Sequence, residues 1–162
     1  MTAATEIAVR MGEIAVSSNP DDVLLSIGLG SCIGLALVDK RAGVAGLAHI
    51  VLPEASGRPK AESLNKFADH AVPALVDGMV ERGASRVFMQ AALVGGASMF
   101  AGAGLEVGSR NADAVRELVA SRRVPVVAEA VGGSRGRTVK VDVTNGTVSV
   151  REAGGTEEVL AA

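Results

Sequence analysis

The sequence predicts a mixed α/β domain in which most strands pair antiparallel. Strand-like segments, either apolar or alternating with period two, outnumber helical ones, and many are neighbours along the chain. Asn145–Gly146 lies between two alternating segments, which is the strongest short-range signal for a β-hairpin. The chain has 162 residues, a length that fits one domain over 1–162 with a sizeable buried core.

The first third of the chain is predicted to be all strand. Two short, partly alternating segments precede a third that runs apolar into a glycine turn. Two further segments are joined by a polar turn that ends at Gly43. The predicted strands cover residues 5–10, 13–17, 23–30, 32–38 and 44–52.

The middle of the chain is predicted to contain a helix and a strand. A loop over 53–62 leads into residues 63–82, whose apolar side chains recur with a period near 3.6. Pro73 should kink or split this helix, because proline lacks the N–H group that a helix interior needs. A buried strand follows over 86–94 and ends at the Gly95–Gly96 turn.

The last third combines one more helix with strands. The helix is predicted to start near Asn111, because asparagine often caps helix N-termini. Residues 124–131 are predicted to form a strand, and 138–150 the hairpin around Asn145–Gly146. We expect the tail over about 153–162 to be frayed.

Composition excludes several classes of protein. A net charge of −2 provides no basic surface for nucleic acid and no polybasic membrane anchor, and the chain has no Trp or Tyr for stacking on bases. No apolar run reaches the length of a membrane span, and charges interrupt the N-terminal segment, so we expect a cytoplasmic protein. The GLGSCIG run has Ile33 where a dinucleotide fingerprint needs its third glycine. One Cys and two His do not suffice for the usual four ligands of a structural zinc site, and we expect no cofactor.

Cys32 is the first candidate for chemistry. It follows a glycine-rich turn at the end of an apolar strand. Backbone N–H groups in such a turn, at Gly30 and Ser31, can lower a thiol pKa and stabilise a developing oxyanion. The alternative is a small buried hydrophobic residue, the more common fate of a free cysteine.

His49 strengthens the case for Cys32. If residues 38 and 43 close a four-residue turn, the hairpin register places Cys32 directly opposite His49, with their Cβ atoms about 4.5–5.5 Å apart. A register shifted by one residue would put them on opposite faces, and the pattern alone allows both. Ser26, in the preceding strand, could orient the imidazole, bind an amide, or simply hydrogen-bond to backbone.

Several ordered motifs carry a resemblance to a known family. They are LLSIGLGSCIGLALVDK, GVAGLAHIVLP, LVGGASMF, VGSRNADAV and VGGSRGRTVKVDVTNGTVSV. Together, over roughly residues 6–151, the sequence resembles the CheD family of bacterial chemoreceptor glutamine deamidases. The resemblance implies an α/β sandwich related to bacterial toxin deamidases of the cytotoxic necrotizing factor type.

The resemblance also implies an activity and its residues. CheD proteins hydrolyse selected glutamine side chains in the cytoplasmic domains of methyl-accepting chemotaxis receptors to glutamate, releasing ammonia. The family's nucleophilic cysteine corresponds to Cys32 and its histidine to His49. Its third catalytic position, a threonine six residues before the cysteine, corresponds to Ser26, which keeps the hydroxyl and lacks the methyl. The family also binds CheC, a phosphatase of the response regulator CheY.

Two alternatives to this hydrolase remain open. One is a CheD-like adaptor that regulates CheC or receptor signalling with weak or lost catalysis, for which the serine at position 26 is the reason. The other is a transglutaminase-like acyl transferase, which shares the cysteine thioester and differs only in the acceptor. Intact Cys32 and His49 favour the hydrolase over the adaptor. The family resemblance, which implies water as the acceptor, favours it over the acyl transferase.

Overall fold

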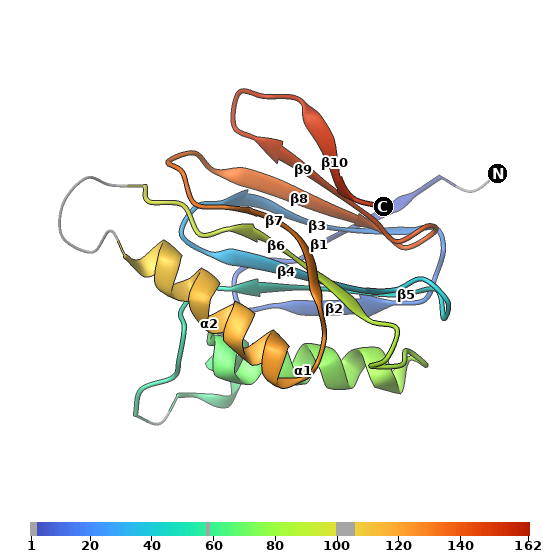
Figure 1. The fold of residues 1–162 in the computed structure, drawn as a ribbon, viewed down its shortest axis with the longest axis horizontal. Coiled ribbons are helices and arrows are strands. Elements are labelled where there is room, and N and C mark those ends of the chain that lie inside the picture. Colours follow the sequence, from blue (N-terminus) through green and yellow to red (C-terminus); the bar gives the residue numbers. More distant parts are fainter. Residues whose placement is uncertain (1–2, 58, 100–105) are drawn as a thin grey trace.

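Ten short strands, two α-helices and one 3-10 helix make up the part of the chain described by the computed structural model, residues 3–57, 59–99 and 106–162 (Figure 1). The elements in chain order are β1 (Thr5–Ala8), β2 (Ile14–Ser17), β3 (Asp22–Leu29), β4 (Ile33–Asp39), β5 (Val44–Ile50), η1 (Ala61–Lys66), α1 (Ala68–Glu81), β6 (Gln90–Gly95), α2 (Val107–Ser121), β7 (Val126–Val131), β8 (Arg137–Asp142), β9 (Thr147–Glu152) and β10 (Glu157–Ala161). Among these residues, no helix has both the length and the apolar character needed to cross a bilayer.

The strands form two five-stranded sheets. Sheet A has the order β1-β3-β8-β9-β10, and sheet B has the order β2-β5-β4-β6-β7. Neighbouring strands pair antiparallel except for β1 with β3 and β6 with β7. Figure 1 shows the sheets stacked, with both α-helices on the side of sheet B that faces away from sheet A. The predicted mixed, largely antiparallel α/β sandwich is confirmed.

The central strands of sheet B are buried on both faces. All residues of β4 and β5 are buried. Along β4, Ile33, Leu35 and Leu37 pack against the helices, while Ala36 and Val38 pack into the apolar layer between the sheets. This explains why the sequence of β4 is apolar almost throughout, because alternate side chains of a strand point to opposite faces and neither face meets water.

The predicted helix over 63–82 is divided at Phe67, not at Pro73. Phe67 is extended (φ −104°, ψ 132°) and forms a β-bridge with Leu52, which separates η1 from α1. Pro73 lies inside α1 without splitting it. The carbonyl that loses its partner to the proline belongs to Asp69, on the exposed side of the helix where water can satisfy it.

The second helix begins at Val107, so the prediction that Asn111 caps it is wrong. The residue before the helix is Glu106, and Asn111 lies inside the helix with no exposed surface. It shares the buried helix face with Gly108 and Val115, at the i, i+3 and i+4 spacing of one stripe. Tertiary packing, not capping, therefore explains an asparagine at this position.

The frayed tail predicted over 153–162 is also wrong in its main part. Residues 157–161 form β10, which pairs antiparallel with β9. Leu160 and Ala161 pack against the apolar layer between the sheets. Hydrogen bonding to β9 and this burial together order a segment whose sequence carries only a weak strand pattern.

The strand predicted over 86–94 starts later, at Gln90. Residues 86–88 form a surface turn in which Val87 is 83% exposed. The Phe88 ring lies under the Arg41 guanidinium, 4.0 Å from its centroid. The predicted hairpin over 138–150 is confirmed, with Asp142 paired to Thr147 and Gly146 in the left-handed region at φ +72°.

Candidate functional site

Cys32 lies in the short turn that carries the chain from sheet A to sheet B. The turn consists of Gly30, Ser31 and Cys32, between β3 and β4. Cys32 is half-buried and packs against the apolar layer between the sheets. A cysteine at the end of one sheet and the start of another is held by both, which restricts where its thiol can point.

Three consecutive carbonyls of this turn accept hydrogen bonds. The Ala97 amide donates to the Gly30 carbonyl and the Gly96 amide to the Cys32 carbonyl, each at 2.9 Å. The Asn111 Nδ2 donates to the Ser31 carbonyl, also at 2.9 Å. Among the described residues, no oxygen accepts a hydrogen bond from the Ser31 or Cys32 amide.

Gly95, at the end of β6, allows this close contact. Its φ of +115° lies in the region that favours glycine, and a Cβ there would come 2.1 Å from the Cys32 carbonyl oxygen. The turn that follows β6 can therefore lie directly against the Cys32 turn only because residue 95 has no side chain.

His49 lies on β5 and is only 6% exposed. Its Nδ1 is 3.1 Å from the Val9 carbonyl oxygen. Because a carbonyl only accepts hydrogen bonds, this contact requires the proton on Nδ1. In the neutral ring, Nε2 then carries the lone pair and is the basic nitrogen.

Ser26 acts on the same carbonyl. It is buried on β3, and its hydroxyl donates to the Val9 oxygen at 2.7 Å. One backbone oxygen therefore accepts from both Ser26 and His49. Of the roles considered for Ser26, the structure shows the hydrogen bond to backbone. This bond also helps to position the Val9 carbonyl, which is the hydrogen-bond partner of His49.

The predicted register, with Cys32 directly opposite His49, is wrong by two residues. The residue opposite His49 is Gly34, and the turn is closed by Asp39 and Val44. The Asp39 carboxylate accepts a hydrogen bond from the Ala42 amide at 3.1 Å, and the Asp39 carbonyl accepts one from the Gly43 amide at 3.0 Å. Both bonds stabilise the turn in the register that pairs Asp39 with Val44.

Because the register differs from the predicted one by two residues, Cys32 and His49 still lie on the same face of the sheet. Side chains two apart along a strand point to the same side, so Cys32, two residues before Gly34, lies diagonally across from His49. Diagonal neighbours are roughly 7–8 Å apart at Cα, within reach of a sulfur and an imidazole. Among the described residues, no hydrogen bond joins the two side chains.

Burial keeps both groups neutral. It raises the pKa of the Cys32 thiol above its ordinary 9.0, an effect that the backbone N–H of Cys32 partly offsets. Burial likewise lowers the pKa of His49 below its ordinary 6.5, against smaller opposing effects of the Val9 carbonyl and the Glu13 charge. Near neutral pH the pair is therefore a thiol beside a neutral imidazole, not a preformed ion pair.

Two residues of the candidate site, Val9 and Asn111, were not predicted from the sequence as site residues. Val9 acts through its carbonyl, so its side chain carries no signal. The sequence predicts Asn111 as a helix cap, and the signal for its buried role is its position one turn before Val115 in an apolar stripe. Phe100, the last residue of the LVGGASMF motif, lies outside the described residues.

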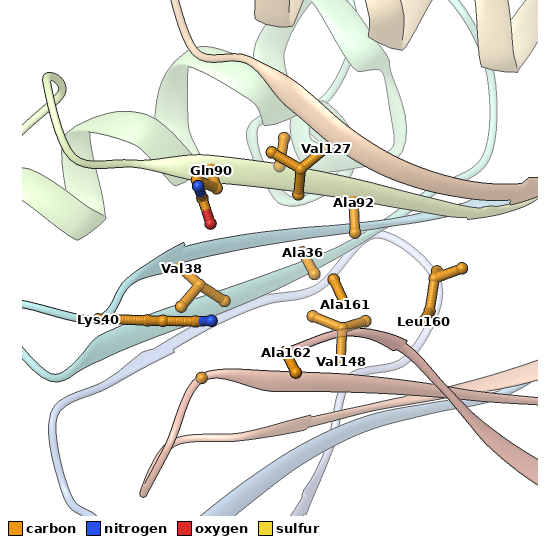
Figure 2. Close-up of a pocket in the computed structure, with 12 residues that line it drawn as sticks. Ala36, Val38, Lys40, Gln90, Ala92, Val127, Val148, Leu160, Ala161 and Ala162 are labelled. Carbon is orange, nitrogen blue, oxygen red and sulfur yellow. The ribbon is translucent and has the colours of Figure 1, made fainter.

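A cavity between the two sheets lies away from these residues. Figure 2 shows it between the sheets. Its volume is about 290 Å³, and alanine and valine form most of its lining. Its lining includes Ala36, Val38 and Lys40, at the end of β4 opposite to Cys32. Within the described ranges, no group of three or more His, Cys, Asp or Glu side chains could hold a metal ion. The chemistry-bearing residues therefore gather at the sheet-crossing turn and not in this cavity.

Comparison with known proteins gives consistent relatives. The family model described as CheD chemotactic sensory transduction matches residues 51–152. A Clostridium botulinum (strain Hall) protein called probable chemoreceptor glutamine deamidase CheD is 40% identical over 159 residues, covering 95% of this chain and 98% of that protein. A Symbiobacterium thermophilum protein of the same description is 42% identical over 158 residues, covering 94% and 96%.

A solved structure shows a similar fold. It is the crystal structure of a Neisseria meningitidis protein of the DUF152 family, with a TM-score of 0.51 and 10% sequence identity. The similarity covers 81% of this chain and 63% of that one. At this level of identity the match speaks for the α/β architecture alone.

Proposed function

The chain belongs to the CheD family, and from this membership we propose that it is a protein-glutamine deamidase. Its substrates would be selected glutamine side chains in the cytoplasmic domains of methyl-accepting chemotaxis receptors, which it converts to glutamate with release of ammonia. The proposed place of action is accordingly the cytoplasm. The observation that carries the proposal is a cysteine and a histidine on one face, with the histidine Nδ1 held by the Val9 carbonyl.

The first step is attack on the glutamine carboxamide. The His49 Nε2 takes the proton of the Cys32 thiol, and the sulfur forms a bond to the carboxamide carbon. The carbonyl electron pair moves onto oxygen and gives a tetrahedral oxyanion. The amides of Ser31 and Cys32, and that of Gly30 at the start of the turn, are the proposed donors to this oxygen.

The second step releases ammonia. The carbon–nitrogen bond breaks as His49 returns its proton to the leaving nitrogen, which leaves a Cys32 thioester. Water then attacks the thioester and gives a proton to His49. The carbon–sulfur bond breaks, the thiolate regains that proton, and the net reaction is glutamine plus water to glutamate plus ammonia. Apart from the substrate and water, these steps use only the groups of this chain named above.

The proposed division of roles follows from the hydrogen bonds. Val9 and Ser26 orient the His49 ring through backbone and hydroxyl, in the way that a third residue orients the base in other nucleophilic enzymes. Serine supplies the same hydroxyl donor that the family's threonine would. This observation favours catalysis over the adaptor alternative, whose rationale was the missing methyl. A CheC-type phosphatase remains a proposed partner, on the family resemblance.

The test is incubation of the purified protein with a receptor cytoplasmic fragment, followed by mass spectrometry of its peptides. We expect glutamines to gain the mass that replaces an amide NH2 with OH. The Cys32→Ala variant, folded by circular dichroism, should give no gain. A wild-type protein that is folded and yet leaves the receptor unmodified would contradict the deamidase and favour the adaptor. Labelling of an added primary amine onto receptor glutamines would instead favour the acyl transferase.

A further inference from the structure

Asn111 connects the two halves of the candidate site. Its side chain lies in α2 with no exposed surface. Its Nδ2 donates to two carbonyls, those of Ser31 and Val51, each at 2.9 Å. Ser31 precedes Cys32, and Val51 follows His49 by two residues. A single amide group therefore ties the turn of the nucleophile to the strand of the histidine.

The bond to Ser31 also determines the direction of an amide. A trans peptide unit is planar, and its C=O and N–H groups point to opposite sides. The Ser31 carbonyl points at Asn111, so the N–H of Cys32, in the same peptide unit, points away from it. By the same geometry, the bond from Ala97 to the Gly30 carbonyl directs the N–H of Ser31.

A glycine in the first turn of α2 allows the helix to pack close enough for Asn111 to reach the Cys32 turn. A Cβ on Gly108, three residues earlier on the same face, would lie 2.5 Å from the Ala97 oxygen and 2.6 Å from the Gly96 oxygen. The first turn of the helix therefore rests directly on the backbone beside Cys32, and any larger residue than glycine would lift it away.

The orientation of Asn111 carries a cost that an apolar residue would avoid. Its Oδ1 is buried and accepts no hydrogen bond from any described residue. A buried acceptor without a partner destabilises a folded protein, so a residue needed only to fill this helix face would better be leucine or alanine. The value of asparagine here lies in its two N–H donors.

We propose that Asn111 is a positioning residue that aims the Cys32 amide at the oxyanion and holds the nucleophile turn in register with the His49 strand. The inference rests on the proposed function for the identity of the reaction, but not for the geometry that it predicts. The hydrogen bonds of Asn111 go to the Ser31 and Val51 carbonyls and not to the thiol or the imidazole. Its loss should therefore act on oxyanion stabilisation and leave thiolate formation nearly unchanged.

The test compares two electrophilic reagents that react with the only cysteine of the chain. Iodoacetamide alkylates Cys32 without forming an oxyanion. Butanal, whose carbon chain matches glutamine from Cα to Cδ, adds reversibly: a sulfur–carbon bond forms, and the thiol proton ends on the former carbonyl oxygen. Its affinity is measured as protection of Cys32 from iodoacetamide, followed by intact-protein mass spectrometry.

The informative variant is Asn111→Leu, which keeps the branched side-chain shape and removes both donors. We expect its protection by butanal to weaken at least about tenfold, and its kcat for receptor deamidation to fall about 10- to 100-fold with KM within about threefold. Its alkylation rate by iodoacetamide should stay within about threefold of wild type. Val115→Ala, one helical turn later, is the matched control and should lower the melting temperature without changing the ratio of the two reactivities.

Three outcomes would overturn the inference. If Asn111→Leu lost butanal affinity and iodoacetamide reactivity to the same extent, its role would be merely structural. The role would also be merely structural if Val115→Ala changed the ratio of the two reactivities as much as Asn111→Leu does. Unchanged protection by butanal in a folded Asn111→Leu would mean that the Cys32 amide needs no such support. A wild-type protein that binds butanal through Asn111 but deamidates no receptor would instead overturn only the proposed function, and the inference would stand.

Discussion

A single backbone oxygen organises the residues around His49. Val9 accepts hydrogen bonds from the Ser26 hydroxyl at 2.7 Å and from the His49 Nδ1 at 3.1 Å. A carbonyl cannot take up the proton, so it fixes the tautomer and ring orientation without changing its own charge. The role given to a carboxylate in many catalytic triads is here proposed for a peptide group.

The Ser26 hydroxyl should matter more than the methyl that a threonine would add. We expect Ser26→Ala to lower the free energy of unfolding by about 1 kcal/mol and to reduce kcat more than Ser26→Thr does, because it leaves the Val9 carbonyl with one donor fewer. Ser26→Thr should change the rate within roughly tenfold, or about 1.4 kcal/mol of barrier. Chemical denaturation and deamidation kinetics measure both, and a far larger gain with threonine would contradict this assignment.

The pH dependence follows from the two burial effects. Because the pKa of His49 is lowered from 6.5, the base stays neutral down to below that pH, and the acid limb of kcat/KM should have its midpoint below pH 6.5. Stability should change in the same range: the unfolded histidine binds a proton more readily, so the free energy of unfolding falls as the pH drops below 6.5.

On the alkaline side, the raised pKa of Cys32 means that the unfolded thiol ionises first, so stability also falls above pH 9. Rate and denaturation profiles from pH 5 to 10 check both limbs. An acid midpoint above 6.5 that disappears in His49→Gln would show that charge partners outweigh burial at the histidine.

At the scale of elements, the turn after β6 decides where Cys32 sits. Gly95 and Gly96 press against the Cys32 turn, and the first turn of α2 rests on the same backbone. Such direct backbone contact needs glycine at both surfaces, because every other residue would add a Cβ. The GG and GSRN segments of the sequence thus serve one contact.

Comparing Gly95→Ala with a second glycine substitution distinguishes the effect of losing this contact from the effect of backbone strain at positive φ. Its new Cβ would lie 2.1 Å from the Cys32 oxygen at a φ of +115°, so the free energy of unfolding should fall by about 2–4 kcal/mol and deamidation should be largely lost. Gly83→Ala is the matched control, with a φ of +102° and nothing within 4 Å of its Cβ. It should cost only about 1–2 kcal/mol and keep activity. Equal effects of the two substitutions would argue against a role for the contact.

At the scale of the whole molecule, the two ends of the sandwich differ. One end carries the turn between the sheets with Cys32, and the other encloses the cavity of about 290 Å³. Figure 2 shows Ala36 and Ala92 of sheet B facing Ala161 and Val148 of sheet A across that space. Small side chains on both sheets leave this cavity between them. Because it lies far from Cys32, we expect substitutions there to change stability without changing activity.

Ala92→Val should fill part of the cavity. We expect it to raise the free energy of unfolding by about 0.5–1 kcal/mol and to leave deamidation unchanged, because the added carbons enter the space at the end far from Cys32. Ala71→Val adds the same carbons to a fully buried position of α1 and should instead destabilise through overpacking. Thermal denaturation of the two variants decides the point, and a destabilised Ala92→Val would mean that the sheets close on this space in solution.

Local patterns were enough to predict much of this molecule. The apolar run of β4, the alternation around Asn145–Gly146 and the 3.6 period before β6 each depend on neighbours in the chain, and the structure confirms the elements that they predict. The choice of Cys32, His49 and Ser26 rests on residue types at motif spacing, which a sequence displays directly. The structure brings these three to one region, through the Val9 carbonyl and a shared face.

Other features depend on contacts between distant segments, which leave no local pattern. The hairpin register follows from the Asp39 side chain bonding the turn, and β10 is ordered by pairing with β9 and by burial between the sheets. Val9 acts through a peptide group that every residue possesses, and Asn111 acts across 80 positions of sequence. Composition and spacing thus identify the chemical groups, whereas their orientation depends on backbone atoms and buried partners that only the folded chain brings together.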